Sequence, residues 1–76
     1  MVDKITKSQY EDIEDAFICD SIAGFHRVLE KHTGISAIPY TSYQYFNGDD
    51  YVGDSNDFDL LDLLKNAYIE VVEDGN

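Results

Sequence analysis

The densest group of potential metal ligands lies in residues 47–59, NGDDYVGDSNDFD, which contain five aspartates. An EF-hand loop needs oxygen ligands at alternating positions, a glycine at its sixth position and a glutamate at its twelfth. A loop that began at Asp54 would have Asp59 at its sixth position and Lys65 at its twelfth, and the other possible starting residues fail earlier. We therefore expect no specific calcium site, which leaves these carboxylates available as a charged surface.

The remaining reactive side chains do not form a catalytic pattern. His26 and His32 are six residues apart, which places them on different sides of a helix, and no third nitrogen or sulfur ligand completes a zinc site. The serines and threonines lack a suitable pattern of histidine and acid partners, and no glycine-rich phosphate loop follows a strand. A domain this small also has little material with which to enclose a pocket. We expect no enzyme activity, no catalytic residue, no metal and no cofactor.

The net charge of −11 is the most unusual property of this chain of 76 residues, which we expect to form a single small acidic domain. Residues 1–38 carry seven acidic and four basic side chains, a net charge of −3. Residues 39–76 carry nine acidic side chains and one basic side chain, a net charge of −8. Self-repulsion of this kind destabilises a compact state. Solubility alone would need much less charge, so we interpret the negative field as functional.

The charge balance also restricts the possible partners. Direct binding to nucleic acid requires a stripe of Lys and Arg side chains that displaces counterions, and this chain has none. Anionic membrane surfaces would repel it, and no run of 18 apolar residues could span a bilayer. The first ten residues, MVDKITKSQY, contain no apolar run typical of a signal peptide. We expect a protein of the cytoplasm, or of the host cytoplasm if it is viral, whose partner is a basic protein.

The first helix is predicted to begin at a capping box. Ser8 and Glu11 have the spacing at which a hydroxyl and a carboxylate satisfy the first exposed amides of a helix. We expect the polar residues before Ser8 to fray. Cys19 has no second cysteine with which to pair and lies in the apolar segment AFICDSIAGF. A free cysteine in such a context is usually a small core residue, so we expect Cys19 to be buried.

The helical segment is predicted to bend or break near residues 19–24. The apolar residues at positions 10, 13 and 17 and those at positions 22, 25 and 29 point about 120° apart, so one straight helix cannot bury both sets. Asp20-Ser21 can begin a second helix, and Gly34 can end it in a left-handed conformation. We expect either a bend or two short helices, roughly at 9–19 and 21–32.

An antiparallel hairpin is predicted at about residues 41–52, around the turn signal Asn47-Gly48. If only these two residues form the loop, Tyr45 lies opposite Asp50. A four-residue loop would instead place Phe46 opposite Tyr51, and the sequence leaves both registers open. A hairpin alone is marginal in water, and the only candidate for a third strand is the segment 35–38.

The last helix is predicted at about residues 57–73. At 100° per residue its apolar side chains form one continuous stripe, and its polar side chains form a column on the other side. The stripe contains Leu60, Leu61, Leu64, Ala67, Tyr68, Val71 and Val72, and the column contains Asp59, Asp62, Asn66, Glu70 and Glu73. Residues 67–72 could alternatively form a strand because they are rich in β-branched and aromatic types. The continuity of the stripe favours helix, so we expect an α+β fold with two or three helices packed with a small antiparallel hairpin.

The acidic half of the chain carries the functional hypothesis. Neighbouring acids on a helix lie about 5–6 Å apart, which is comparable with the spacing of about 7 Å between phosphates of a nucleic-acid strand. Exposed tyrosines beside them would add the aromatic contacts that are common in protein interfaces. We expect a DNA mimic that inhibits or regulates a DNA- or RNA-handling protein by occupying its basic binding surface, as in phage or mobile-element counter-defence. The expected contact residues are Asp49, Asp50, Asp54, Asp57, Asp59, Asp62, Glu70, Glu73, Tyr45 and Tyr51.

Two other functions fit the same features. Acidic helices beside an aromatic and acidic segment look similar to bacteriocin-nuclease immunity proteins, over no more than a few residues, so no family is assigned. The chain could then be an immunity- or antitoxin-like inhibitor of one basic nuclease or toxin. It could also be a small structural or assembly homodimer that buries the tyrosine-rich sheet. The chain is accordingly expected to be a monomer or a homodimer.

Overall fold

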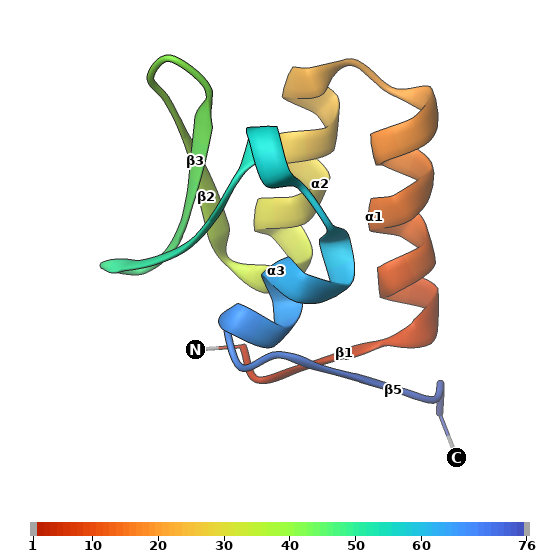
Figure 1. Ribbon diagram of the computed structural model, residues 1–76. Coiled ribbons are helices and arrows are strands. Elements are labelled where there is room, and N and C mark those ends of the chain that lie inside the picture. Colours follow the sequence, from red (N-terminus) through yellow and green to blue (C-terminus); the bar gives the residue numbers. More distant parts are fainter. Residues whose placement is uncertain (1, 76) are drawn as a thin grey trace.

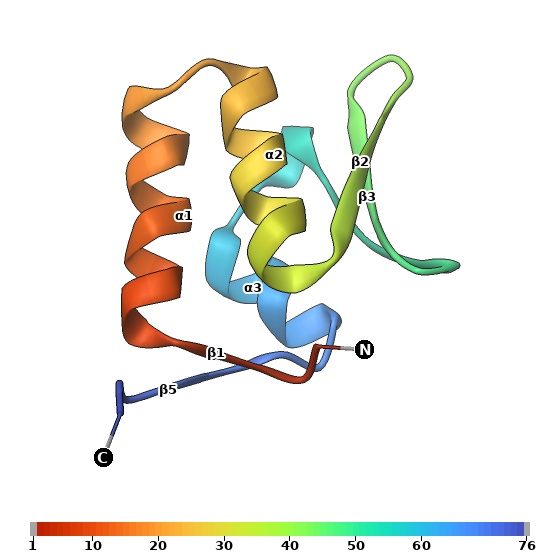
Figure 2. The same cartoon turned by 180° about the vertical axis from the view of Figure 1, so that it is seen from behind.

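The computed structural model describes residues 2–75, which form helices and strands in an α+β arrangement (Figures 1 and 2). In chain order the elements are β1 (Lys4–Thr6), α1 (Lys7–Cys19), α2 (Ile22–Thr33), β2 (Ile35–Pro39), β3 (Tyr43–Asn47), β4 (Asp50–Asp54), the 3₁₀ helix η1 (Ser55–Asp57), α3 (Leu60–Asn66) and β5 (Glu70–Val72). Strands β2, β3 and β4 form an antiparallel sheet in that order. The predicted α+β class is therefore confirmed. None of the helices in the described part of the chain is long and apolar enough to cross a membrane.

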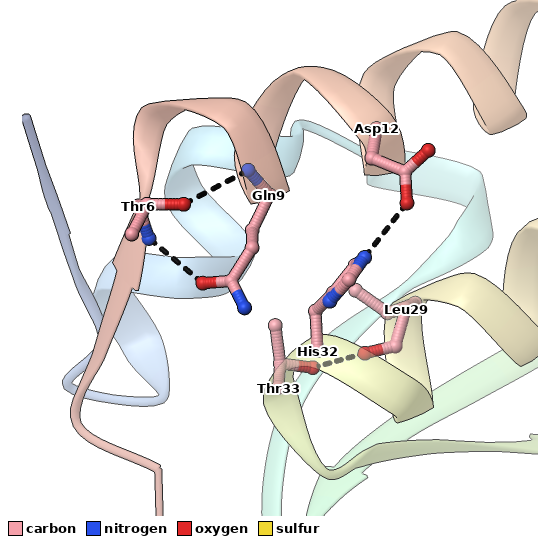
Figure 3. Close-up of polar contacts among 6 residues, drawn as sticks. All are labelled: Thr6, Gln9, Asp12, Leu29, His32 and Thr33. Carbon is pink, nitrogen blue, oxygen red and sulfur yellow. Dashed lines mark hydrogen bonds and ion pairs between the residues drawn. The ribbon is translucent and has the colours of Figure 1, made fainter. Parts of the chain in front are cut away.

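Helix α1 begins with a capping box that lies two residues earlier than predicted. The Thr6 hydroxyl accepts a hydrogen bond from the Gln9 amide at 3.1 Å, and the Gln9 side chain accepts one from the Thr6 amide at 2.9 Å (Figure 3). The prediction that Ser8 and Glu11 form this box was wrong. Residues Lys4–Thr6 do not fray but pair in β1, so Thr6, the last residue of β1, takes the capping position; Met1 lies outside the described residues.

The predicted break between two helices is confirmed at Asp20-Ser21. The Asp20 carboxylate accepts a hydrogen bond from the Ser21 amide at 2.8 Å, and the Ser21 hydroxyl accepts one from the Gly24 amide at 3.1 Å. Helices α1 and α2 then lie side by side, with α2 between α1 and the sheet (Figures 1 and 2). Cys19, at the end of α1, is exposed rather than buried. It lies about 120° around the helix from the core residue Ile13, which faces it away from the core.

The C-terminal end of α2 is fixed by three consecutive residues. The Thr33 hydroxyl is buried and donates a hydrogen bond to the Leu29 carbonyl at 2.6 Å (Figure 3). It also accepts one from the Ile35 amide at 3.1 Å. Gly34 has φ of 80°, the left-handed conformation predicted for it. Near this end, Nε2 of His32 lies 2.7 Å from Oδ2 of Asp12 and joins α2 to α1 (Figure 3).

The sheet adopts the register in which Phe46 lies opposite Tyr51. The segment 35–38 pairs with β3 as part of β2, which confirms the predicted third strand. Asn47 also pairs with Asp50, so only two residues form the loop, and one of them is Gly48 with φ of 66°. The register then shifts between Tyr45 and Phe46, and Tyr45 faces Gly53.

The predicted C-terminal helix was wrong beyond Asn66. Helix α3 is short and ends in a Schellman motif, in which the Tyr68 amide donates to the Lys65 carbonyl at 3.0 Å and the Ile69 amide donates to the Leu64 carbonyl at 2.9 Å. The chain then continues as strand β5, which the sequence had offered as the less favoured alternative.

Strand β5 pairs in parallel with β1, so that Lys4 lies opposite Glu70 and Ile5 opposite Val71 (Figures 1 and 2). The β-branched residues of this segment favour an extended strand once a partner is present. Beyond β5, the Asp74 carboxylate accepts a hydrogen bond from the Ser8 amide at 2.9 Å. Hydrogen bonding by the Ser8 side chain, followed by that of its amide, holds the pKa of Asp74 below its usual range. The two ends of the described chain therefore stabilise each other.

The Schellman motif places Tyr68 in a strained conformation. Its φ is 59°, a left-handed value that glycine adopts freely and that is unfavourable for a residue with a Cβ atom. The side chain is 89% exposed, so little packing offsets the strain. A tyrosine at this position therefore destabilises the folded state relative to a glycine.

We predict that Tyr68→Gly raises the free energy of unfolding by about 0.5–1 kcal/mol, because relief of backbone strain exceeds the added entropy of the unfolded chain. Urea denaturation measures this change. Tyr68→Ala is the matched control, since it removes the same ring but keeps the Cβ atom, and it should give no such gain. A glycine variant no more stable than the alanine variant would contradict the prediction.

His26 is hydrogen-bonded across the interface between α2 and β3, where its Nε2 lies 2.9 Å from the Tyr45 hydroxyl. Burial lowers the pKa of His26, so the folded state favours the neutral imidazole. In the unfolded chain His26 has a pKa of about 6.5, so as the pH falls it takes up a proton there before it does so in the folded protein. The stability that His26 contributes is therefore complete above about pH 6.5 and decreases below it.

Titration of the imidazole by NMR should give a His26 pKa below 6.5 in the folded protein. In Tyr45→Phe the pKa should remain lowered, because burial is its cause and the variant keeps the ring that covers His26. A measured value at or above 6.5 would contradict this account.

Candidate functional site

The structure divides the predicted acidic contact residues into three groups. Asp49 and Asp50 are exposed at the turn between β3 and β4. Glu70 and Glu73 are exposed on and just after β5. The remaining four acids lie between the end of β4 and the first turn of α3. The predicted helical column from Asp59 to Glu73 was wrong because α3 ends at Asn66, and with it the phosphate-like spacing along one helix is lost.

The third group forms the strongest concentration of charge. Its members, which we call the acidic cluster, all line one small surface hollow of about 40 Å³ together with Gly53, Phe58 and Asn66. The acidic cluster consists of Asp54, Asp57, Asp59 and Asp62. The close approach of α3 to β4 brings them together: a Cβ atom on Gly53 would lie 2.9 Å from Cδ1 of Leu63. The Asn66 side chain also donates a hydrogen bond to the Val52 carbonyl at 2.9 Å.

Two members of the acidic cluster also have roles in folding. Asp54 accepts hydrogen bonds from the Ser42 hydroxyl and the Asn56 amide, both at 2.8 Å. Asp59 caps α3 by accepting hydrogen bonds from the amides of residues 61 and 62 at 3.0 and 3.3 Å. Asp57 and Asp62 are exposed and lie beside these fixed groups. The cluster therefore combines two carboxylates that are held by hydrogen bonds, Asp54 and Asp59, with two exposed acids beside them.

Phe58 holds this part of the chain against the core. Its ring lies 4.8 Å from that of Phe17 in α1, 5.5 Å from that of Phe25 in α2 and 5.8 Å from that of Tyr45 in β3, measured between ring centres. The neighbours of Phe58 on both sides, Asp57 and Asp59, are exposed. An aromatic ring packed inward between two aspartates thus fixes where the carboxylates lie. The sequence shows this pattern as Asp-Phe-Asp, but its importance was missed.

No member of the acidic cluster forms an ion pair within residues 2–75. The one contact of ion-pair length in this part of the chain joins His32 to Asp12 and is an ion pair only when the imidazole is protonated. Lys65, the only basic residue in the second half, lines a different hollow with Leu61 and Tyr68. Within the same residues, no three His, Cys, Asp or Glu side chains are grouped so as to hold a metal ion. The arrangement can attract a cationic surface through carboxylates that have no ion-pair partner among the described residues.

The two predicted tyrosines have different positions. Tyr51 is 57% exposed beside Asp50, and its ring lies 5.7 Å from that of Phe46. Tyr45 is 1% exposed, and its burial raises its pKa to about 12. The expectation that Tyr45 contacts a partner was therefore wrong, because it lies on the face of β3 that packs against His26 of α2.

Several exposed apolar side chains were also missed. Leu61 and Tyr68 were assigned to the buried stripe of the last helix, yet Leu61 is 59% exposed and Tyr68 has left the helix. Phe17 and Ile18 of α1 are also exposed. Together with Leu61 they line one hollow on the surface between α1 and α3. In the sequence, the one sign of these exposed side chains is that each helical segment has more apolar residues than a single buried face can hold.

No family model matches this chain, and neither a curated protein nor a solved structure does so. Its function must be inferred from its charge and geometry.

We predict that Phe58→Ala lowers the free energy of unfolding by about 2–3 kcal/mol, slightly less than a fully buried Phe→Ala change, because the ring is only partly buried. Phe46→Ala is the control, since Phe46 is also partly buried but packs against the exposed Tyr51, and it should cost less. Urea denaturation of both variants makes the comparison. Equal losses would show that Phe58 is not a special anchor.

Proposed function

We propose that this chain is a small, acidic, non-catalytic inhibitor or regulator that mimics nucleic acid. It occupies the basic binding surface of a DNA- or RNA-handling protein in the cytoplasm. The observation that carries the proposal is the acidic cluster: Asp54, Asp57, Asp59 and Asp62 gather around one hollow, and none of them forms an ion pair within residues 2–75. Asp49 and Asp50, at the opposite end of β4, add further negative charge to this half of the chain.

Charge of this density suits a partner that normally binds phosphates. A single exposed ion pair contributes at most about 1 kcal/mol, so recognition needs several carboxylates engaged together. The fixed positions of Asp54 and Asp59 reduce the entropy lost when a partner binds. Complementary charge also accelerates association and selects against acidic competitors. Because exposed charges are screened beyond about 10 Å at 0.1 M salt, such binding must weaken as salt rises.

We predict that affinity capture from a lysate of the source host recovers a basic nucleic-acid-binding protein at about 50 mM salt and loses it at about 300 mM. The double variant Asp57→Asn, Asp62→Asn should capture much less of it. The matched control is Glu11→Gln, Asp15→Asn, which removes the same charge from exposed positions of α1. Mass spectrometry of the eluates measures recovery, and the recovered protein should lose bound duplex DNA when this chain is added.

Three outcomes would overturn the proposal: binding that persists at high salt, equal effects of the two double variants, or no competition with DNA. Retention of one nuclease at high salt, without competition for DNA, would support the immunity-like alternative instead.

A further inference from the structure

A second surface of the molecule is apolar and lies between α1 and α3. Phe17 and Ile18 of α1 and Leu61 of α3 line a hollow of about 330 Å³. Leu61 also lines a hollow of about 420 Å³ that is bounded by Tyr68 and Val71. The shared Leu61 joins the two hollows into one surface, which we call the apolar groove. Contiguous exposure of large apolar side chains usually marks an interaction site.

The charges around the apolar groove indicate the chemistry of its occupant. Glu14 and Asp59 line its first hollow, and Glu70 lines the second, where Lys65 is the one basic residue. A second copy of this chain would bring another net charge of −11 to the same place. Like charges at an interface oppose association. The groove therefore suits a partner whose apolar side chains are flanked by lysine or arginine.

The walls of the groove also limit the backbone conformation of this partner. The first hollow is lined by α1, by the start of α3 and by residues 58–59 between η1 and α3. This first hollow offers no free ladder of backbone groups to which an extended peptide could add as a strand. In the second hollow, β5 has only the three residues Glu70–Val72, a short edge for such pairing. A partner that satisfies its own backbone hydrogen bonds is needed, and an amphipathic helix laid into a groove is the common solution.

Tyr68 gives an independent reason to assign a binding role to this surface. It holds an exposed aromatic ring at a left-handed backbone position where glycine would be more favourable. Strained residues that gain little from packing are concentrated at functional sites. Tyrosine is also a frequent anchor in protein interfaces.

We propose that the apolar groove binds a cationic amphipathic helix of the target protein, with apolar side chains seated around Leu61 and Tyr68. The inference rests on the proposed function in one respect, because it takes the target to be basic. It adds a second contact surface, of different chemistry, beside the acidic cluster.

The test uses three synthetic helical peptides of equal length and the full chain. The first peptide has a leucine stripe flanked by lysines, the second has the same stripe flanked by glutamates, and the third has the lysines but serine in place of leucine. Fluorescence anisotropy should show binding of the first peptide at both 50 and 300 mM salt, and weak or no binding of the other two. Equal binding by the serine peptide would mean that charge alone is recognised and would overturn the inference.

Variants of the chain locate the contact. Leu61→Lys should weaken binding of the leucine–lysine peptide about tenfold or more. Ile38→Lys is the matched control, since Ile38 in β2 is 48% exposed and lies outside both hollows, and it should bind as the unaltered chain does. Tyr68→Gly should weaken binding although it stabilises the fold, which separates a contact role from a structural one.

The remaining outcomes separate this inference from the proposed function. No effect of Leu61→Lys, or a dimer in sedimentation experiments that Leu61→Lys disrupts, would overturn the inference. If the peptide fails to bind while Asp57→Asn, Asp62→Asn still reduces capture of the basic target, the groove inference alone is wrong. If Leu61→Lys blocks peptide binding while capture is insensitive to salt, the mimicry proposal alone is wrong.

Discussion

The ring of Phe58 lies against Phe17, Phe25 and Tyr45, and through them it joins α1, α2 and β3 to the loop that precedes α3. A chain this small buries a limited core, so one aromatic contact that joins three elements has a large share in its stability. The same contact determines the surface. Asp57 and Asp59 are exposed because the residue between them is packed inward, and the apolar groove borders Phe58 from the other side. Core packing and both candidate surfaces therefore depend on one side chain.

The pairing of the two ends of the chain explains where α3 stops. Strand β1 offers unpaired backbone groups, and the β-branched segment that follows Tyr68 supplies their partner in β5. Residues Glu70–Val72 could continue α3 only if β1 were left without hydrogen bonds. The strained Tyr68 turns the chain from one element to the other. Backbone pairing has prevailed here over a continuous helical pattern in the sequence.

The sequence was sufficient at several positions where local chemistry decides the structure. The helix break at Asp20-Ser21 and the left-handed Gly34 follow from capping and backbone preferences that involve only near neighbours. Strand β5 could not be predicted in the same way, because its partner lies more than 60 residues away and was expected to fray. For the same reason the grouping of the acids could not be predicted from the sequence. Their exposure follows from their type, but the acidic cluster exists only because α3 packs on β4.

The fold also distinguishes acids that stabilise the structure from acids that have no evident structural use. Asp12 pairs with His32, Asp20 and Asp59 cap helices, and Asp74 binds the first turn of α1. These acids therefore have an ordinary structural role, which for those near helix N-termini includes a favourable interaction with the helix dipole. A second set of carboxylates is exposed and stays as a source of repulsion in the folded state. This set is concentrated in the second half of the chain and contains Asp49, Asp50, Asp57, Asp62, Glu70 and Glu73.

Repulsion of this kind lowers stability without improving packing. The exposed ring of Tyr68 and the exposed side chain of Leu61 add further costs that the isolated fold does not require. Features that are unfavourable in the free chain and lie on neighbouring surfaces are most simply explained by a bound state that uses them together. A basic partner with an apolar stripe would reverse both costs at once, because it neutralises the carboxylates and covers the groove.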